Sequence, residues 1–83
     1  MSCYNIMAVL INHRSQNAPK VQTTLTKHGC IIKLRIGLHE AGDACTEEGL
    51  VLLQLCGNDE EIKQLENDLN AIEGVRAKTM HIS

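Results

Sequence analysis

The order of hydrophobic patterns along the chain limits the folds that it can adopt. Two segments repeat apolar residues at helical spacing, and four shorter segments are rich in β-branched and apolar residues and bounded by polar or Gly-containing runs. The predicted elements are strand, helix, strand, strand, helix and strand, at residues 4–11, 18–28, 31–38, 50–56, 59–73 and 75–82. With right-handed crossovers, this order predicts a ferredoxin-like α+β fold, with an antiparallel sheet ordered 4-1-3-2 and both helices on one face.

The ends of the two helices carry recognisable signals. Asn17 is expected to cap the first helix, with Pro19 in the first turn, where a missing N–H is tolerated. Asn58 followed by Glu61 resembles a capping box at the start of the second helix. Gly74 is expected to end that helix before the last strand begins.

The two faces of the sheet are expected to differ in character. Strands 4–11 and 50–56 are apolar on both sides and should lie at the centre, whereas the edge strands alternate apolar and charged residues. The face without helices should therefore have an apolar centre, flanked by Lys33, Arg35, Arg76 and Lys78. An apolar face open to water usually marks an interaction surface, so we expect a dimer or tetramer formed through the sheet.

Length and composition limit the function classes. A chain of 83 residues is expected to form a single domain over residues 1–83. Eight Lys and Arg against ten Asp and Glu give no basic patch for direct nucleic-acid binding. The longest wholly apolar run, residues 6–11, is far too short for a membrane helix, and no leader segment is expected. Four cysteines without a secretory signal are expected to be reduced thiols in a cytoplasm.

Two His and two Cys between residues 28 and 45 resemble a metal site in the sequence, but the predicted fold separates them. The strand between Cys30 and His39 spans roughly 25 Å, so the four groups cannot share one ion. The topology instead gathers another set at one rim of the sheet: Cys3, Cys30, Cys56 and His81. These residues are either small buried side chains at strand ends or, as an alternative, a transition-metal or thiol-redox sensor. Cys56 could neighbour either Cys3 or Cys30, and Cys30 with Cys56 is the pairing to check; no cofactor is the first expectation.

The opposite rim is the candidate ligand site. The start of the first helix lies there beside the long acidic connection after residue 38, and a helix N-terminus next to a loop suits a small anion or other ligand. The candidate ligand-binding residues are His13, Arg14, Asn17 and His39. The alternative, which the sequence favours, is that the loop is a solvated acidic connection. No catalytic constellation is apparent, and an acyl-phosphate hydrolase centred on Arg14 is a weaker alternative because the glycines of an anion-binding first loop are missing.

Two stretches carry a family resemblance that extends over nearly the whole chain. They are "RIGL" (residues 35–38) and the ending L-x-x-I-x-G-V-x-x-K-T (residues 69–79). The chain resembles the iron-only hydrogenase system regulators, an ACT-like group related to the C-terminal domain of the nickel-responsive regulator. The resemblance implies a homo-oligomeric regulatory module, linked through a protein partner to hydrogenase expression or maturation. ACT domains that bind amino acids usually have a glycine early in the first helix, where this chain has Ala18, Pro19 and Lys20, and the His/Cys set of the nickel regulator is not reproduced.

Overall fold

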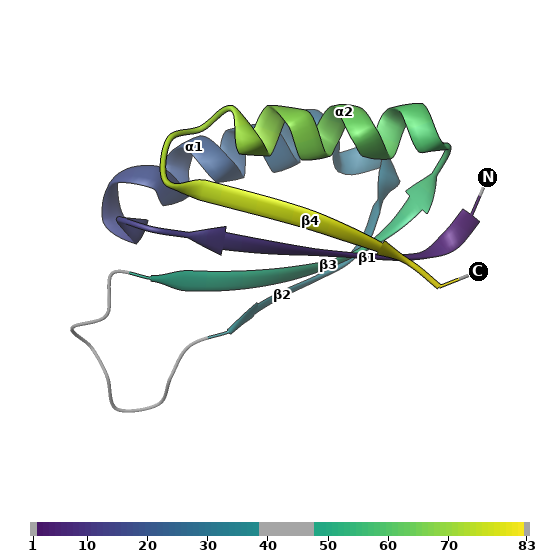
Figure 1. The fold of residues 1–83 in the computed structure, drawn as a ribbon, viewed down its shortest axis with the longest axis horizontal. Helices are drawn as coiled ribbons and strands as arrows, with labels where there is room; N and C mark the ends of the chain where they lie inside the picture. The colour runs from purple at the N-terminus through teal and green to yellow at the C-terminus, as the bar shows by residue number, and fades with distance from the viewer. Residues whose placement is uncertain (1, 39–47, 83) are drawn as a thin grey trace.

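The computed structural model describes residues 2–38 and 48–82. In chain order its elements are β1 (Ser2–Ile11), α1 (Arg14–Lys27), the short 3-10 helix η1 (Gly29–Ile31), β2 (Ile32–Leu38), β3 (Gly49–Gly57), α2 (Asp59–Asn70) and β4 (Val75–His81). The strands form one antiparallel sheet ordered β2-β3-β1-β4, and both helices cover the same face (Figure 1). This is the predicted order read from the other edge, so the ferredoxin-like α+β fold is confirmed. In the described part of the chain, no helix is long and apolar enough to span a membrane.

The core lies between the sheet and the two helices. Val21 and Leu25 from α1 are almost fully buried, as are three apolar residues spaced along one side of α2. Alternate residues of β1, β3 and β4 point toward them because successive side chains of a strand face opposite sides of the sheet. The buried hydrophobic residues of the sheet and of α2 are Met7, Val9, Ile11, Val51, Leu53, Leu55, Val75, Ala77, Ile62, Leu65 and Leu69.

The boundaries of α2 confirm the local signals at its start. The Asn58 side chain accepts a hydrogen bond from the Glu61 backbone N–H at 2.8 Å, and the Glu61 carboxylate accepts one from the Asn58 backbone N–H at 3.1 Å. This reciprocal pair is the predicted capping box. The helix itself ends at Asn70, and Gly74 follows in the turn before β4 with a φ of 85°. That backbone conformation favours glycine because a Cβ atom is strongly disfavoured there.

The start of α1 differs from the prediction. The helix begins at Arg14, after His13 in a left-handed conformation, so Pro19 lies inside the helix and Asn17 is not its cap. Asn17 is buried, and its side-chain amide donates to the backbone oxygens of Asn12, at 2.6 Å, and Glu73, at 3.1 Å. Its role is therefore to join the β1–α1 connection to the α2–β4 connection, 56 residues further along the chain.

The edge strand β2 faces the opposite way from the prediction. Arg35 lies opposite the buried Leu53, and its guanidinium donates to the side-chain oxygen of Gln22 on α1. The expectation that Arg35 flanks the open face is therefore wrong, because its side of the strand faces the helices. Lys33 occupies an irregularity between Ile32 and Leu34, where the register gives it no opposite residue in β3. This irregularity turns the apolar residues that follow it toward the open face.

Candidate functional site

The sheet surface away from the helices, here called the open face, carries a broad apolar area. Rows of neighbouring side chains run across all four strands of this face. One such row consists of Ile36, Leu52, Ala8 and Lys78, in the order of the strands. Several large apolar side chains of the open face are exposed to water, with exposed fractions of 58% for Met80, 51% for Leu34, 43% for Ile36 and 36% for Leu50. Apolar side chains gathered on an exposed surface usually mark an interaction site, so the open face is the candidate association surface.

The charges on the open face are gathered at one edge. Arg76 lies opposite Leu10 and Lys78 opposite Ala8, so both cations border the apolar area along β4, as predicted. The other edge, β2, contributes Leu34 and Ile36. The open face therefore has one apolar edge and one cationic edge, rather than cations on both sides.

A hollow surrounds the start of α1, at the rim of the sheet opposite the predicted Cys and His rim. It has a volume of about 960 Å³ and combines residues of α1 and of the β1–α1 and α2–β4 connections with Glu48, just before β3. Its lining is mostly polar and includes both signs of charge: Asn12, His13, Gln16, Asn17, Lys20, Glu48, Glu73 and Gly74. Of the four predicted ligand residues, His13 and Asn17 line the hollow, Arg14 is the first residue of α1, and His39 lies outside the described residues.

Within the hollow, the two predicted residues have different roles. The Asn17 amide donates to the Asn12 and Glu73 carbonyl oxygens, so it holds the wall of the hollow together. His13 is exposed and stands in a left-handed conformation (φ 52°) just before the helix. Such a conformation is uncommon for a residue with a side chain. His13 is therefore free to meet a ligand in a way that Asn17 is not.

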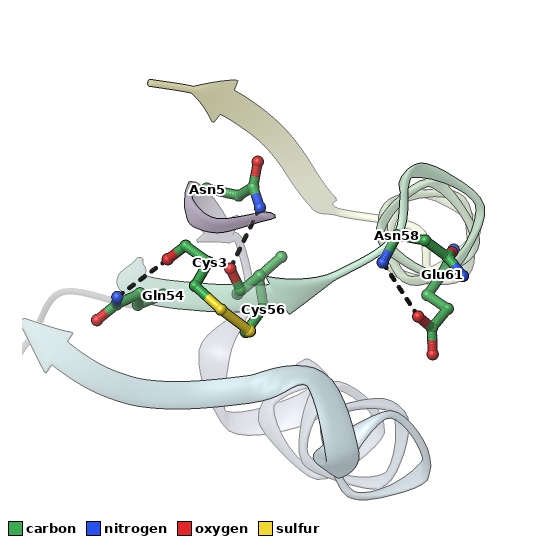
Figure 2. The surroundings of a disulfide bond; sticks show 7 residues. Cys3, Asn5, Gln54, Cys56, Asn58 and Glu61 are labelled. Atoms are coloured by element: carbon green, nitrogen blue, oxygen red, sulfur yellow. Dashed lines mark hydrogen bonds between the residues drawn. A yellow bond between two sulfur atoms is a disulfide. The ribbon is translucent and has the colours of Figure 1, made fainter. Parts of the chain in front are cut away.

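The predicted Cys and His rim is only partly assembled. Cys3 and Cys56 form a disulfide between β1 and β3, and the Gln54 side chain donates to the Cys3 carbonyl oxygen at 3.1 Å (Figure 2). This differs from the expectation of four reduced thiols. Cys30 is exposed and unpaired on η1, and the His81 ring hydrogen-bonds the side-chain oxygen of Asn5. Over residues 2–38 and 48–82, no group of three or more His, Cys, Asp or Glu is arranged to hold a metal ion.

A polar contact between the helices was not predicted. The His28 ring lies 2.8 Å from a carboxylate oxygen of Asp68 on α2, and Lys27 approaches the same carboxylate at 3.9 Å. The hydrogen bond with His28, assisted by one from Gln64, lowers the pKa of Asp68 below its ordinary value. The sequence carries no local signal for this pair, because its members are 40 residues apart.

Comparison with known proteins identifies the fold but no family. No family model and no curated protein matches the chain. An uncharacterized protein from Thermotoga maritima has a similar solved structure, with a TM-score of 0.84, 24% identity and 95% of each chain covered. Prephenate dehydratase from Streptococcus mutans matches with a TM-score of 0.63 and 15% identity, over 93% of this chain and 41% of that one.

The regulatory subunit of aspartate kinase from Thermus flavus matches with a TM-score of 0.57 and 16% identity, over 96% of this chain and 53% of that one. The chain thus spans about half, or less, of these two longer proteins. At such identities the similarity concerns the fold alone. The chain shares the ferredoxin-like fold with these proteins.

Proposed function

We propose that the protein is a non-catalytic regulatory module that self-associates through its open face. The observation that carries this proposal is the exposure of Leu34, Ile36 and Met80 on one surface. Burying a side chain of this size contributes about 1.5–3 kcal/mol, so covering several of them favours association. The proposal includes no metal or cofactor, no nucleic acid and no membrane partner, and it assigns the protein to the cytoplasm.

The size of the open face fits a small self-association interface. Strands about 4.8 Å apart and a rise of about 3.3 Å per residue give a sheet of four strands and seven residues a face of roughly 19 by 23 Å in plan. Side-chain relief makes the accessible area larger than this plan area. The plan area of about 440 Å² is roughly half of the 800 Å² per partner of a standard interface, so a dimer or a tetramer formed through this face would have a small interface.

A pair of substitutions on β2 tests the self-association. Ile36→Glu places a carboxylate on the open face, whereas Arg35→Glu places the same group on the helix side of the same strand. Size-exclusion chromatography with light scattering should show an oligomer for the parent protein and for Arg35→Glu, and a monomer for Ile36→Glu. A parent protein that stays monomeric at tens of micromolar would contradict the proposal.

The hollow at the start of α1 is the proposed ligand site of the module. Its lining offers His13 and Lys20 to an anionic group, and Glu48 and Glu73 to a cationic group. A small molecule that bears both charges matches this lining. Because α1 contains no glycine, the contacts from this helix would come from its side chains.

Thermal unfolding in the presence of free L-amino acids tests this site, with the matching 2-hydroxy acids as controls that lack the ammonium group. An amino acid that binds should raise the unfolding midpoint more than its 2-hydroxy analogue does. The combined variant His13→Ala and Lys20→Ala should lose the shift. If no amino acid moves the midpoint of the parent protein, this ligand class is ruled out.

The regulated system is proposed to be the iron-only hydrogenase. Support for this part comes from the sequence resemblance at residues 35–38 and 69–79. Since the module needs a protein partner to act, affinity purification of the tagged chain from its own host should recover a protein of hydrogenase expression or maturation. Unchanged hydrogenase activity after deletion of the gene would contradict the link.

A further inference from the structure

We propose that Cys3 and Cys56 form a thiol–disulfide exchange site at the rim of the open face, and that its redox state controls how tightly two copies associate. The inference rests on the proposed self-association and adds its regulation. It narrows the predicted Cys and His rim to the one pair of thiols that the fold brings into contact.

The strand register places this pair on the association surface. Leu55 is fully buried on the helix side of β3, so its neighbours Gln54 and Cys56 face the open side. Cys3 reaches the same side through its bond to Cys56, and both cysteines are half-buried. The disulfide is therefore reachable in a single copy, whereas a second copy seated on the open face would cover it.

The disulfide restrains a short end of β1 that is only loosely part of the sheet. The pairing of β1 with β3 is regular from Asn5 onward but shifts register between Ser2 and Asn5. Within that shift, the Gln54 side chain donates to the Cys3 carbonyl oxygen, and the backbone N–H of Ile82 donates to the Tyr4 carbonyl oxygen at 3.0 Å. Cleaving the disulfide removes the one covalent restraint on this end, which borders the apolar rows of the open face.

The exchange reaction needs a dithiol as its partner. A thiolate of the dithiol attacks one sulfur of the Cys3–Cys56 bond, forming a mixed disulfide and releasing the other cysteine as a thiolate, which takes up a proton. The second thiolate of the partner then attacks the mixed disulfide and releases the remaining cysteine. Two electrons and two protons pass to the protein, and the partner leaves as a disulfide. In a reducing compartment, pairs of this kind are typically transient and redox-sensing.

The coupling to association follows from preorganisation. With the disulfide intact, the end of β1 is fixed before a second copy arrives, so less conformational entropy is lost on binding. The oxidised protein should therefore associate more tightly. Because coupling between two equilibria is reciprocal, association should also protect the disulfide from reduction.

Sedimentation velocity on a variant with Cys30→Ser and Cys45→Ser tests the proposal, since Cys3 and Cys56 are then the only thiols left. The variant is oxidised with oxidised glutathione or reduced with dithiothreitol, and its thiols are titrated. We expect two free thiols per chain only after reduction. In the reduced state, the dissociation constant for self-association should be at least about tenfold larger. A control variant that also carries Cys3→Ser and Cys56→Ser should have the dissociation constant of the reduced protein, both with oxidised glutathione and with dithiothreitol.

The outcomes separate this inference from the proposed function. Equal dissociation constants in both states, tighter association after reduction, or failure of Cys3 and Cys56 to oxidise would each overturn the exchange site while leaving self-association in place. Absence of association in either state, with Ile36→Glu indistinguishable from its parent, would overturn both.

Discussion

At the scale of single residues, buried polar groups organise the parts of the molecule that the sequence predicts least well. The Asn17 amide donates to carbonyl oxygens of two separate connections and is almost fully buried. From the sequence, Asn17 was expected to be a helix cap, because Asn is common at that position. The sequence contains no local signal for a partner 56 residues away, so only the assembled fold shows this role.

Asp68 gives a prediction about acid stability at the same scale. Its pKa is lowered from the ordinary value of 3.8, first by the hydrogen bond with His28 and then by the one with Gln64. A carboxyl whose pKa is lower in the folded state than in the unfolded state stabilises the fold at pH values above its unfolded-state pKa. This contribution is lost as the pH falls through the folded-state pKa. The free energy of unfolding should therefore fall as the pH drops below about 3.8.

Urea unfolding measured from neutral pH into this acidic range tests the role of Asp68. Asp68→Asn removes the titrating group and should flatten that part of the curve. Asp59→Asn is the matched control, because Asp59 lies at the exposed start of the same helix. Equal acid sensitivity in the parent protein and in Asp68→Asn would show that the His28 contact is unimportant.

At the scale of elements, local signals predicted helix starts only where the capping groups are close in sequence. The capping box of α2 depends on Asn58 and Glu61 alone, and it is present as predicted. The start of α1 and the facing of β2 depend on contacts with other elements. Arg35 faces the helices because of the register irregularity after Ile32 and the Gln22 side chain on α1. The alternating pattern of β2 fixes two sides for the strand but does not say which side faces the core.

Gly74 lies in the turn before β4, where a side chain would disturb both the backbone and a neighbouring contact. It has a φ of 85°, and an added Cβ would lie 2.9 Å from the Asn17 amide nitrogen. Gly74→Ala should therefore lower the free energy of unfolding by about 1–3 kcal/mol, through backbone strain and displacement of the Asn17 contact. Gly29→Ala is the matched control, because a Cβ there meets nothing within 4 Å. Denaturant unfolding of the two variants checks the difference, and similar losses would contradict it.

At the scale of the whole molecule, the fold joins residues that the sequence keeps far apart. The order of strands and helices was predictable because each element carries its own periodicity and the handedness of crossovers leaves few topologies. The pairing of Cys30 with Cys56, which the sequence singled out, is wrong, because Cys56 is bonded to Cys3 on the neighbouring strand β1 and Cys30 is free. The orientation of β2 places Leu34 and Ile36 on the open face, and this makes the open face more apolar than the sequence indicated.

If a second copy covers the open face, dilution should uncover it, and methyl NMR on a dilution series can follow this change. We predict that the methyl resonances of Leu34, Ile36 and Leu52 shift progressively on dilution, because their surroundings change from protein to water. The methyl groups of Val21 and Leu25, buried between the sheet and α1, should stay unchanged. Open-face resonances that do not move across a range in which the molecular mass changes would contradict the claim, since association would then use another surface.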